Sequence, residues 1–403
     1  MALIPVADAL AAVLAGAEPL PEERVALDAA WHRVLARDVA ALRTQPPQAM
    51  SAMDGYAVRY ADAAQANSRL KVIGEVAAGR PFDVSVGAGE AVRIFTGGVI
   101  PDGADTVVIQ EDTVVDGGDV TITQPARPGR HIRPAGVDFR EGDLLLARGR
   151  RLTERDLSLA AGMNHSELPV RRRPKVALLA TGDELVMPGS KPGDGQIVYS
   201  NGYALRALAE AEGAETIDLG IAADTMAATV SGIRRAREAG ADILITTGGA
   251  SVGDHDLIKP ALEAEGISIA FWKIAMRPGK PMIHGRLGTM RVIGLPGNPV
   301  SSYVCAFLFM LPLIRALSGR SAIYHRRESA VLGRDIAAND FREDYLRACL
   351  QELADGKLLA TPVDQQDSSL LAKLAAAQAL LIRAPFAPAA AAGSACEVLR
   401  LPI

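Results

Sequence analysis

The chain has 403 residues, enough for two to four domains of ~100–200 residues each. Its hydrophobic content of 49% and charged content of 22% are ordinary for a globular protein, and its net charge of −4 gives no positive field for nucleic acid. The three cysteines are far apart and form no CxxC pair, which argues against a zinc site or a disulfide framework and fits a reducing cytoplasm (Cys305, Cys349 and Cys396).

The first 170 residues predict a β-rich domain inserted into a helical one. Residues 5–40 have apolar side chains at helical spacing, and no signal-peptide pattern precedes them. Thr153-Glu-Arg-Asp156 resembles a capping box and begins a helix that runs to about Met163. Between these helical segments, short β-like runs alternate with Gly, Pro and Asp turns (Ala91–Phe95, Thr106–Gln110 and Val120–Thr123). Because insertion at a surface turn costs little, we expect a helical domain that is interrupted by a β-rich domain. The helical domain would consist of residues 1–43 and 142–170, and the inserted β-rich domain of residues 44–141.

From residue 171 to 323 the chain alternates strands and helices, which predicts a doubly wound α/β domain. We expect Asn201 and Asp224 to cap two of its helices. The run from Pro299 to Leu317 is apolar but contains Pro312, and we expect a buried helix there instead of a membrane span. Residues 324–403 are expected to be mostly β, with one helix near 369–379. The other segments expected in the α/β domain are strands at 176–179, 216–219, 243–246 and 269–274 and helices at 202–212 and 224–239.

The strongest chemical signal is the loop Thr246–Asp256, where a buried strand runs into glycines and then into paired acids. Ligands of open α/β sheets bind beyond the carboxyl ends of the strands. The backbone N–H groups around Thr247, Gly248, Gly249 and Ser251 are suited to hold phosphate oxygens, and Asp254 and Asp256 are suited to hold Mg²⁺. The alternative from composition alone is a tight turn with solvated acids.

Three further segments are predicted at the same edge of the sheet. Thr181-Gly182-Asp183-Glu184 repeats the order of strand, Thr-Gly and acids. Trp272–Pro281 brings three cations to a strand end, which suits an oxyanion or a polyphosphate (Lys273, Arg277 and Lys280). Gly294–Ser302 offers the N-terminus of a helix, with Pro296 before it, Asn298 as N-cap and Pro299 at its first position. Each segment also has a structural explanation, respectively a turn, a solvated hairpin and a capped helix.

In the β-rich module three loops carry polar side chains, namely Asp54, Thr96 and the pair Arg133 and Asp138. Alone, each loop is more often structural than functional. No GxSxG motif appears, and no histidine accompanies a nucleophile motif, so Ser/His/Asp catalysis is not supported.

Seven ordered motifs, taken together, resemble one family, the molybdopterin molybdenumtransferases or MoeA family, which includes the C-terminal domain of gephyrin. A weaker match is Gln366–Leu370, and the matches cover nearly the whole chain. The motifs are Ser51–Ala57, Phe95–Pro101, Ile132–Asp138, Thr181–Leu185, Thr246–Asp256, Trp272–Pro281 and Gly294–Ser302.

The resemblance implies four domains, the last a β-barrel at 324–403, and an elongated homodimer whose cleft both subunits complete. It implies the insertion of molybdenum from molybdate into adenylylated molybdopterin with release of AMP, dependent on Mg²⁺. Lys273 and Arg277 would bind molybdate or stabilise the leaving phosphate. The metal would be held by four acids, Asp183, Glu184, Asp254 and Asp256. Asp54, Thr96 and Asp138 would face the cleft. Arg277 stands where many members have a second lysine, which keeps the charge but puts a proton-transfer role in doubt.

Two other functions stay open. The α/β domain is shared with the molybdopterin adenylyltransferases, although the additional domains and the form of the glycine loop count against that reaction. A scaffold that binds a partner peptide, as gephyrin does, is the non-catalytic alternative, although the acids and cations of the family site are present here. Molybdopterin adenylyltransferase and apo-molybdoenzymes are expected as partners, with no nucleic acid or membrane, and the choice between molybdate and tungstate is undecided.

Overall fold

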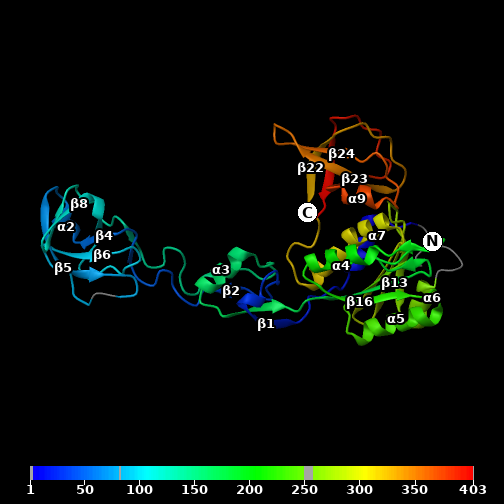
Figure 1. The fold of residues 1–403 in the computed structure, drawn as a ribbon, viewed down its shortest axis with the longest axis horizontal. Helices are drawn as coiled ribbons and strands as arrows, with labels where there is room; N and C mark the ends of the chain where they lie inside the picture. Colours follow the sequence, from blue (N-terminus) through cyan, green and yellow to red (C-terminus); the bar gives the residue numbers. More distant parts are fainter. Residues whose placement is uncertain (1–2, 81–82, 249–256, 403) are drawn as a thin grey trace.

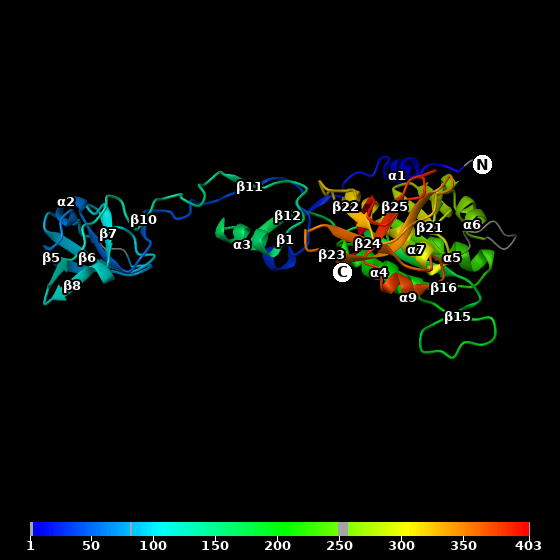
Figure 2. The same ribbon diagram turned by 90° about the horizontal axis from the view of Figure 1, so that it is seen from above.

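The computed structural model describes residues 3–80, 83–248 and 257–402. The molecule is elongated: a β-rich unit lies at one end, a central unit follows, and an α/β unit and a C-terminal unit lie together at the other end (Figures 1 and 2). Each of these four units contains a buried apolar cluster of its own. The exact domain boundaries given above stay a prediction.

The N-terminal segment corrects the prediction of a helix over residues 5–40. Helix α1 covers only Val6–Leu14, and the chain then forms β1 (Glu22–Ala26), a short 3₁₀ turn (Leu27–Ala29) and β2 (Val39–Ala40). Pro19 and Pro21 explain the change, because proline removes a helix hydrogen bond and crowds the preceding turn. The prediction extended helical spacing past its real end at residue 14.

Helix α1 also packs away from the rest of its predicted domain. Its buried side chains Val6, Ala9 and Val13 belong to the apolar core of the α/β unit. Arg291 of that unit donates through Nη1 to the carbonyl of Ala15 at 2.9 Å, at the end of the helix where carbonyl groups lack partners. Tertiary packing therefore assigns α1 to the α/β unit (Figure 2).

The central unit is mostly β instead of helical. β1 pairs antiparallel with β12 (Glu167–Arg171), and β2 pairs with β11 (Leu144–Leu146). Its α-helix is α3 (Glu154–Gly162), whose capping box is confirmed: Thr153 N and Oγ1 both donate to Asp156 Oδ2, at 2.8 and 2.9 Å. Two chain segments of this unit share one core, in which Leu35 and Leu168 are fully buried.

The inserted unit is built on a six-stranded sheet in the order β7-β4-β6-β5-β9-β8. The predicted strands near 91–95, 106–110 and 120–123 are confirmed. Its other elements are the two-residue strands β3 (Met50–Ser51) and β10 (Ile132–Arg133), helix α2 (Tyr60–Ala63) and a 3₁₀ turn (Gln110–Asp112). The sheet strands are β4 (Gly55–Val58), β5 (Ser68–Val76), β6 (Glu90–Ile94), β7 (Thr106–Ile109), β8 (Thr113–Asp116) and β9 (Asp119–Ile122).

The α/β unit has the predicted doubly wound sheet, in the order β16-β13-β17-β21-β20-β18, with its first four strands parallel. Alternate residues of β13 point into different cores. Val176 and Leu178 pack with helix α4 (Asn201–Ala211) and the long apolar helix at 299–317, and Ala177 and Leu179 pack with α5 (Met226–Glu238) and α6 (Ile258–Ala264). The strands are β13 (Lys175–Thr181), β16 (Glu215–Ala222), β17 (Ile243–Thr247), β18 (Ser268–Lys273), β20 (Pro281–Leu287) and β21 (Met290–Leu295).

The helices of this unit are α4 (Asn201–Ala211), α5 (Met226–Glu238) and α6 (Ile258–Ala264). Both predicted N-caps are wrong by one residue. Ser200 is the N-cap of α4, and Thr225 is the N-cap of α5, where its hydroxyl accepts from Ala228 N at 3.2 Å. A hydroxyl at this position satisfies a free helix N–H as well as a carboxylate would.

The long apolar helix is confirmed as α7 (Pro299–Cys305), a π-helical segment (Ala306–Met310) and α8 (Leu311–Leu317). By length and composition it could span a membrane, but 89% of its apolar window is buried inside the protein. Its side chains fill the core beneath the sheet and contact α1. It is therefore a core helix, as the sequence predicted.

The C-terminal unit is a closed barrel of five strands, because β23 pairs with β24 on one side and with β25 on the other. β19 (Met276–Arg277) from the α/β unit joins it by pairing in parallel with β23. The helix α9 (Leu371–Ala375) agrees with the prediction. The barrel strands are β22 (Arg327–Leu332), β23 (Glu343–Glu352), β24 (Leu358–Pro362), β25 (Ala379–Arg383) and β26 (Ala395–Arg400).

Candidate functional site

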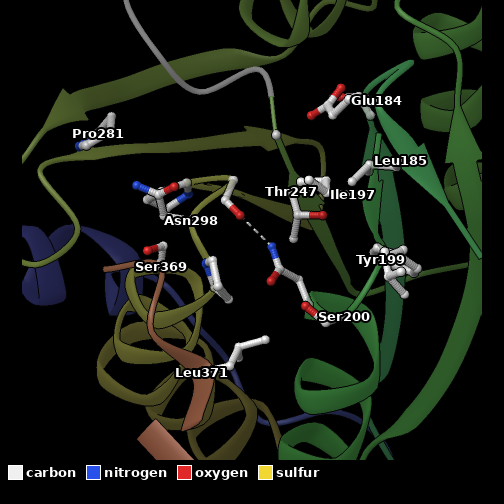
Figure 3. Close-up of a pocket in the computed structure, with 17 residues that line it drawn as sticks. Glu184, Leu185, Ile197, Tyr199, Ser200, Thr247, Pro281, Asn298, Ser369 and Leu371 are labelled. Carbon is white, nitrogen blue, oxygen red and sulfur yellow. Dashed lines mark hydrogen bonds between the residues drawn. The ribbon is translucent and has the colours of Figure 1, made fainter. Parts of the chain in front are cut away.

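A cavity of about 590 Å³ opens at the carboxyl edge of the α/β sheet (Figure 3). It is large enough for a small-molecule ligand of several rings or phosphates. Seven of the residues predicted from the sequence line it: Thr181, Glu184, Thr247, Gly248, Pro296, Asn298 and Pro299.

Three neighbouring parallel strands bring these residues together. β13 ends at Thr181, β17 ends at Thr247, and Pro296 directly follows β21. Gly248 has a φ of +90°, and a Cβ built on it would lie 2.4 Å from the carbonyl oxygen of Thr181. Glycine is therefore required where β17 leaves the sheet, and its bare backbone lies at the cavity wall.

The opposite wall joins the α/β unit to the C-terminal barrel. Asn201 Nδ2 donates to the Gly297 carbonyl at 2.8 Å, the bond drawn in Figure 3. Asn298 is the N-cap residue of α7, as predicted, but its side chain donates to Ser368 Oγ at 2.9 Å instead of capping the helix. The barrel segment held in this way contributes Ser369 and Leu371 to the cavity.

One part of the lining is apolar and was missed from the sequence. It comes from two short paired strands, β14 (Leu185–Val186) and β15 (Ile197–Val198), and from Tyr199 after them. Tyr199 is buried, and burial raises the pKa of its phenol to about 12, so the hydroxyl stays protonated. The available signal was the apolar run Ile197–Tyr199 placed directly before a helix at this edge of the sheet.

The predicted acids occupy different places. Glu184 is exposed at the cavity. Asp183 Oδ1 accepts from Asp224 N at 3.0 Å, and Asp183 N donates to Asp224 Oδ2 at 3.3 Å, so two carboxylates lie side by side at the ends of β13 and β16. The sequence predicted only a helix cap at Asp224. Gly249, Ser251, Asp254 and Asp256 lie outside the described residues, and within the described ranges no three acid, His or Cys side chains form a metal-binding group.

One of the three predicted cations is engaged in another contact, and the grouping of all three stays a prediction. Arg277 binds the C-terminal barrel: its Nε donates to Asp344 Oδ2 at 3.0 Å and its Nη2 to Asn339 Oδ1 at 3.2 Å. Lys273 and Lys280 lie at the base of the hairpin that carries Arg277. There Lys273 pairs with Pro281, and Ile274 N donates to the Lys280 carbonyl. Lys280 directly precedes Pro281, which lines the cavity, and Gly182 lies between the lining residue Thr181 and Asp183.

Asp54 and Thr96 of the inserted unit form a second, separate group. Thr96 donates to Asp54 Oδ1 from its backbone N at 2.7 Å and from its hydroxyl at 2.9 Å, and both bonds lower the pKa of the carboxyl group. The structure does not bring Asp138 to this pair: it is exposed near the central unit, where its N–H donates to the Gln45 carbonyl and the next residue, Phe139, packs into that unit's core. This group lies at the opposite end of the molecule from the cavity, so a single chain does not bring the two together (Figure 1).

Three family models match successive parts of this chain. Residues 4–163 match the family model described as MoeA N-terminal region (domain I and II), residues 177–316 match a probable molybdopterin binding domain, and residues 329–401 match MoeA C-terminal region (domain IV). A molybdopterin molybdenumtransferase of Haemophilus influenzae is 40% identical over 75% of this chain and 74% of its own length. The Bacillus subtilis molybdopterin molybdenumtransferase is 35% identical over 94% and 90%. The crystal structure of a molybdopterin biosynthesis MoeA protein from Pyrococcus horikosii superimposes with a TM-score of 0.85, 31% identity and 99% coverage of both chains.

Proposed function

The chain belongs to the MoeA family and is a molybdopterin molybdenumtransferase of molybdenum cofactor biosynthesis, and we propose that the cavity beside Thr181 and Gly248 is where it holds adenylylated molybdopterin. In this proposal molybdate supplies the molybdenum and AMP is released. The observation that carries it is the cavity itself, because it combines a phosphate-binding edge with an apolar wall.

The polar edge of the cavity suits the pyrophosphate link of such a ligand. The backbone at Gly248 is accessible because no side chain covers it, and the hydroxyls of Thr181 and Thr247 lie beside it. The N-terminus of the long helix, which begins at Pro299, adds a positive partial charge from the helix dipole, and the Val300 N–H there donates to the Ser368 carbonyl at 3.0 Å. The apolar wall around Ile197 and Tyr199 suits a planar heterocycle, and the dithiolene sulfurs of the substrate bind the metal without a protein cysteine.

The donors near the phosphate edge suit Mg²⁺, which prefers carboxylate oxygen. Glu184 is exposed at the cavity, and Asp183 lies next to Asp224 at the same edge. We propose that Asp183 and Glu184 hold the ion together with Asp254 and Asp256. When bound, Mg²⁺ would neutralise charge on the phosphate oxygens.

We also propose a homodimer, because the cavity and the Asp54 group cannot meet within one chain (Figure 1). In the dimer, Asp54, Thr96 and Asp138 of one protomer would face the cavity of its partner. Lys273 and Lys280 would attract molybdate to the cavity rim. Arg277 would hold the hairpin against the barrel through Asp344, and its charge would act on the anion from there. The protein would work in the cytoplasm, receive its substrate from molybdopterin adenylyltransferase and deliver product to apo-molybdoenzymes.

AMP release tests this proposal directly. The purified protein is mixed with adenylylated molybdopterin and Mg²⁺, with and without molybdate, and AMP is quantified by chromatography. AMP should appear only with molybdate, and Asp254→Ala should abolish the release. Formation of the AMP ester from ATP and molybdopterin would support the adenylyltransferase alternative. A protein that neither binds nor cleaves the substrate would support the scaffold alternative.

A further inference from the structure

Arg93 on β6 contacts the turn that carries Asp54, and the functions described so far give it no role. Its cross-strand partner on β4 is Tyr56, two residues after Asp54. The Arg93 guanidinium carbon lies 5.1 Å from the centroid of the Tyr56 ring and 5.0 Å from that of Phe95, the residue before Thr96. A cation in this position attracts both ring faces and ties together the two segments that carry Asp54 and Thr96.

The same guanidinium bonds the backbone of the Asp54 turn. Arg93 Nη1 donates to the Gly55 carbonyl at 3.3 Å, and Nη2 donates to Gln110 Oε1 at 2.7 Å. Gln110 in turn donates from its own N–H to the Asp54 carbonyl at 3.1 Å. Arg93 and Gln110 therefore hold two consecutive carbonyl groups, those of Asp54 and Gly55.

The Asp54 turn has little freedom to move in other directions. A Cβ built on Gly55 would lie 2.0 Å from the Val108 carbonyl, so this backbone lies directly against β7. The side chain of Asp54 receives both Thr96 hydrogen bonds on Oδ1. Among the described residues nothing donates a hydrogen bond to Oδ2, which leaves that oxygen available to a ligand.

We propose that Arg93 is a positioning residue that fixes the orientation of Asp54 and Thr96 toward the substrate. The inference rests on the proposed role of Asp54 in the reaction. The planar fork of arginine serves both hydrogen bonds at once and stacks between the rings, which a lysine ammonium cannot do. Beyond the two Thr96 hydrogen bonds, the charge of Arg93 makes a smaller contribution that also lowers the pKa of Asp54.

The test compares Arg93→Met and Arg93→Lys with the wild type in the molybdate-dependent AMP assay. Methionine packs against both rings through its polarisable sulfur, so the sheet should keep its fold, which thermal unfolding verifies. We expect kcat to fall about tenfold to a hundredfold in Arg93→Met while KM changes less than about threefold, because orientation matters in the transition state. Arg93→Lys, which keeps the cation over the rings, should give an intermediate kcat.

A matched control and a double variant separate positioning from a merely structural role. Arg69→Met removes an exposed arginine of the same sheet that pairs with Asp116 and Asp119, and it should leave kcat unchanged. In an Asp54→Asn background, measured by single turnover, Arg93→Met should reduce the rate by less than about twofold, because its effect passes through Asp54.

The two hypotheses fail in different ways. Wild-type activity in Asp54→Asn would overturn the proposed role of Asp54. A low rate in Asp54→Asn together with full activity in Arg93→Met would overturn only the positioning role. Equal losses from Arg93→Met in the wild-type and Asp54→Asn backgrounds would overturn it as well, because Arg93 would then act independently of Asp54.

Discussion

Replacing Gly248 by alanine should damage the proposed phosphate edge far more than it damages the fold. A Cβ at this position would lie 2.4 Å from the Thr181 carbonyl oxygen, whereas ordinary contacts begin at 3.4 Å. The backbone must therefore move by about 1 Å at the wall of the cavity. The residue also has a φ of +90°, which costs an L-amino acid about 1–3 kcal/mol.

A displacement of about 1 Å between bound groups typically reduces a rate about 100-fold. We therefore expect Gly248→Ala to lower kcat/KM for adenylylated molybdopterin by about that factor, with weaker binding in calorimetry. Gly240→Ala is the matched control: its φ is also positive, at +68°, but no atom lies within 4 Å of the added Cβ. The control should lose stability through backbone strain and keep its activity.

The measurement is molybdate-dependent AMP release under single-turnover conditions, with urea unfolding of each variant in parallel. Full kcat/KM in Gly248→Ala would refute the assignment of this edge to the substrate. An equal loss of activity in Gly240→Ala would show that positive-φ strain anywhere in the unit disturbs the reaction, and the argument from the contact with Thr181 would fail.

Three other predictions concern stability and assembly. Burial lowers the pKa of His284 and of His325 to about 4. Between pH 6.5 and 4 the unfolded chain therefore binds protons that the folded chain does not. The free energy of unfolding should fall with decreasing pH by about 2–3 kcal/mol per histidine. Urea titrations at pH 7 and 4.5 measure this loss, which should be smaller in His325→Gln; an unchanged pH dependence in that variant would contradict the reasoning. Glu212→Gln should destabilise the protein by about 3–5 kcal/mol, because Arg315 and Arg320 are largely shielded from solvent against this carboxylate. Asp218→Asn, from an exposed pair with Arg206, should cost less than about 1 kcal/mol, and equal unfolding midpoints in urea would reject the difference. Mixing the impaired Asp54→Asn and Gly248→Ala chains should restore about a quarter of the wild-type activity, since half of the randomly exchanged dimers contain one intact site. Failure to regain activity despite proven subunit exchange would argue against a shared site.

Much of the α/β unit could be predicted because its signals are local. The middle of strand β13, Val176–Ala180, consists of apolar residues that are buried on both faces, and the glycine after β17 marks the turn at the sheet edge. Strands that alternate with helices become parallel neighbours, which places Thr181 and Thr247 together before any contact is known. The N-terminal segment shows the limit of this method, because apolar spacing over residues 6–14 was extended past Pro19.

The sequence by itself determined the strand-end motifs, the glycine turn after β17 and the family, whereas the contact with Thr181 that requires glycine at position 248 came from the structure. Tertiary structure alone decided which distant segments meet. It brought Ser369 of the barrel into the cavity, placed Arg277 against Asp344, and moved helix α1 onto the α/β unit. The physical reason is that backbone propensity and hydrophobic period act over a few neighbouring residues, whereas these contacts depend on packing between units far apart in the chain. The glycine-rich edge of the sheet was thus predictable, but the wall that completes it was not.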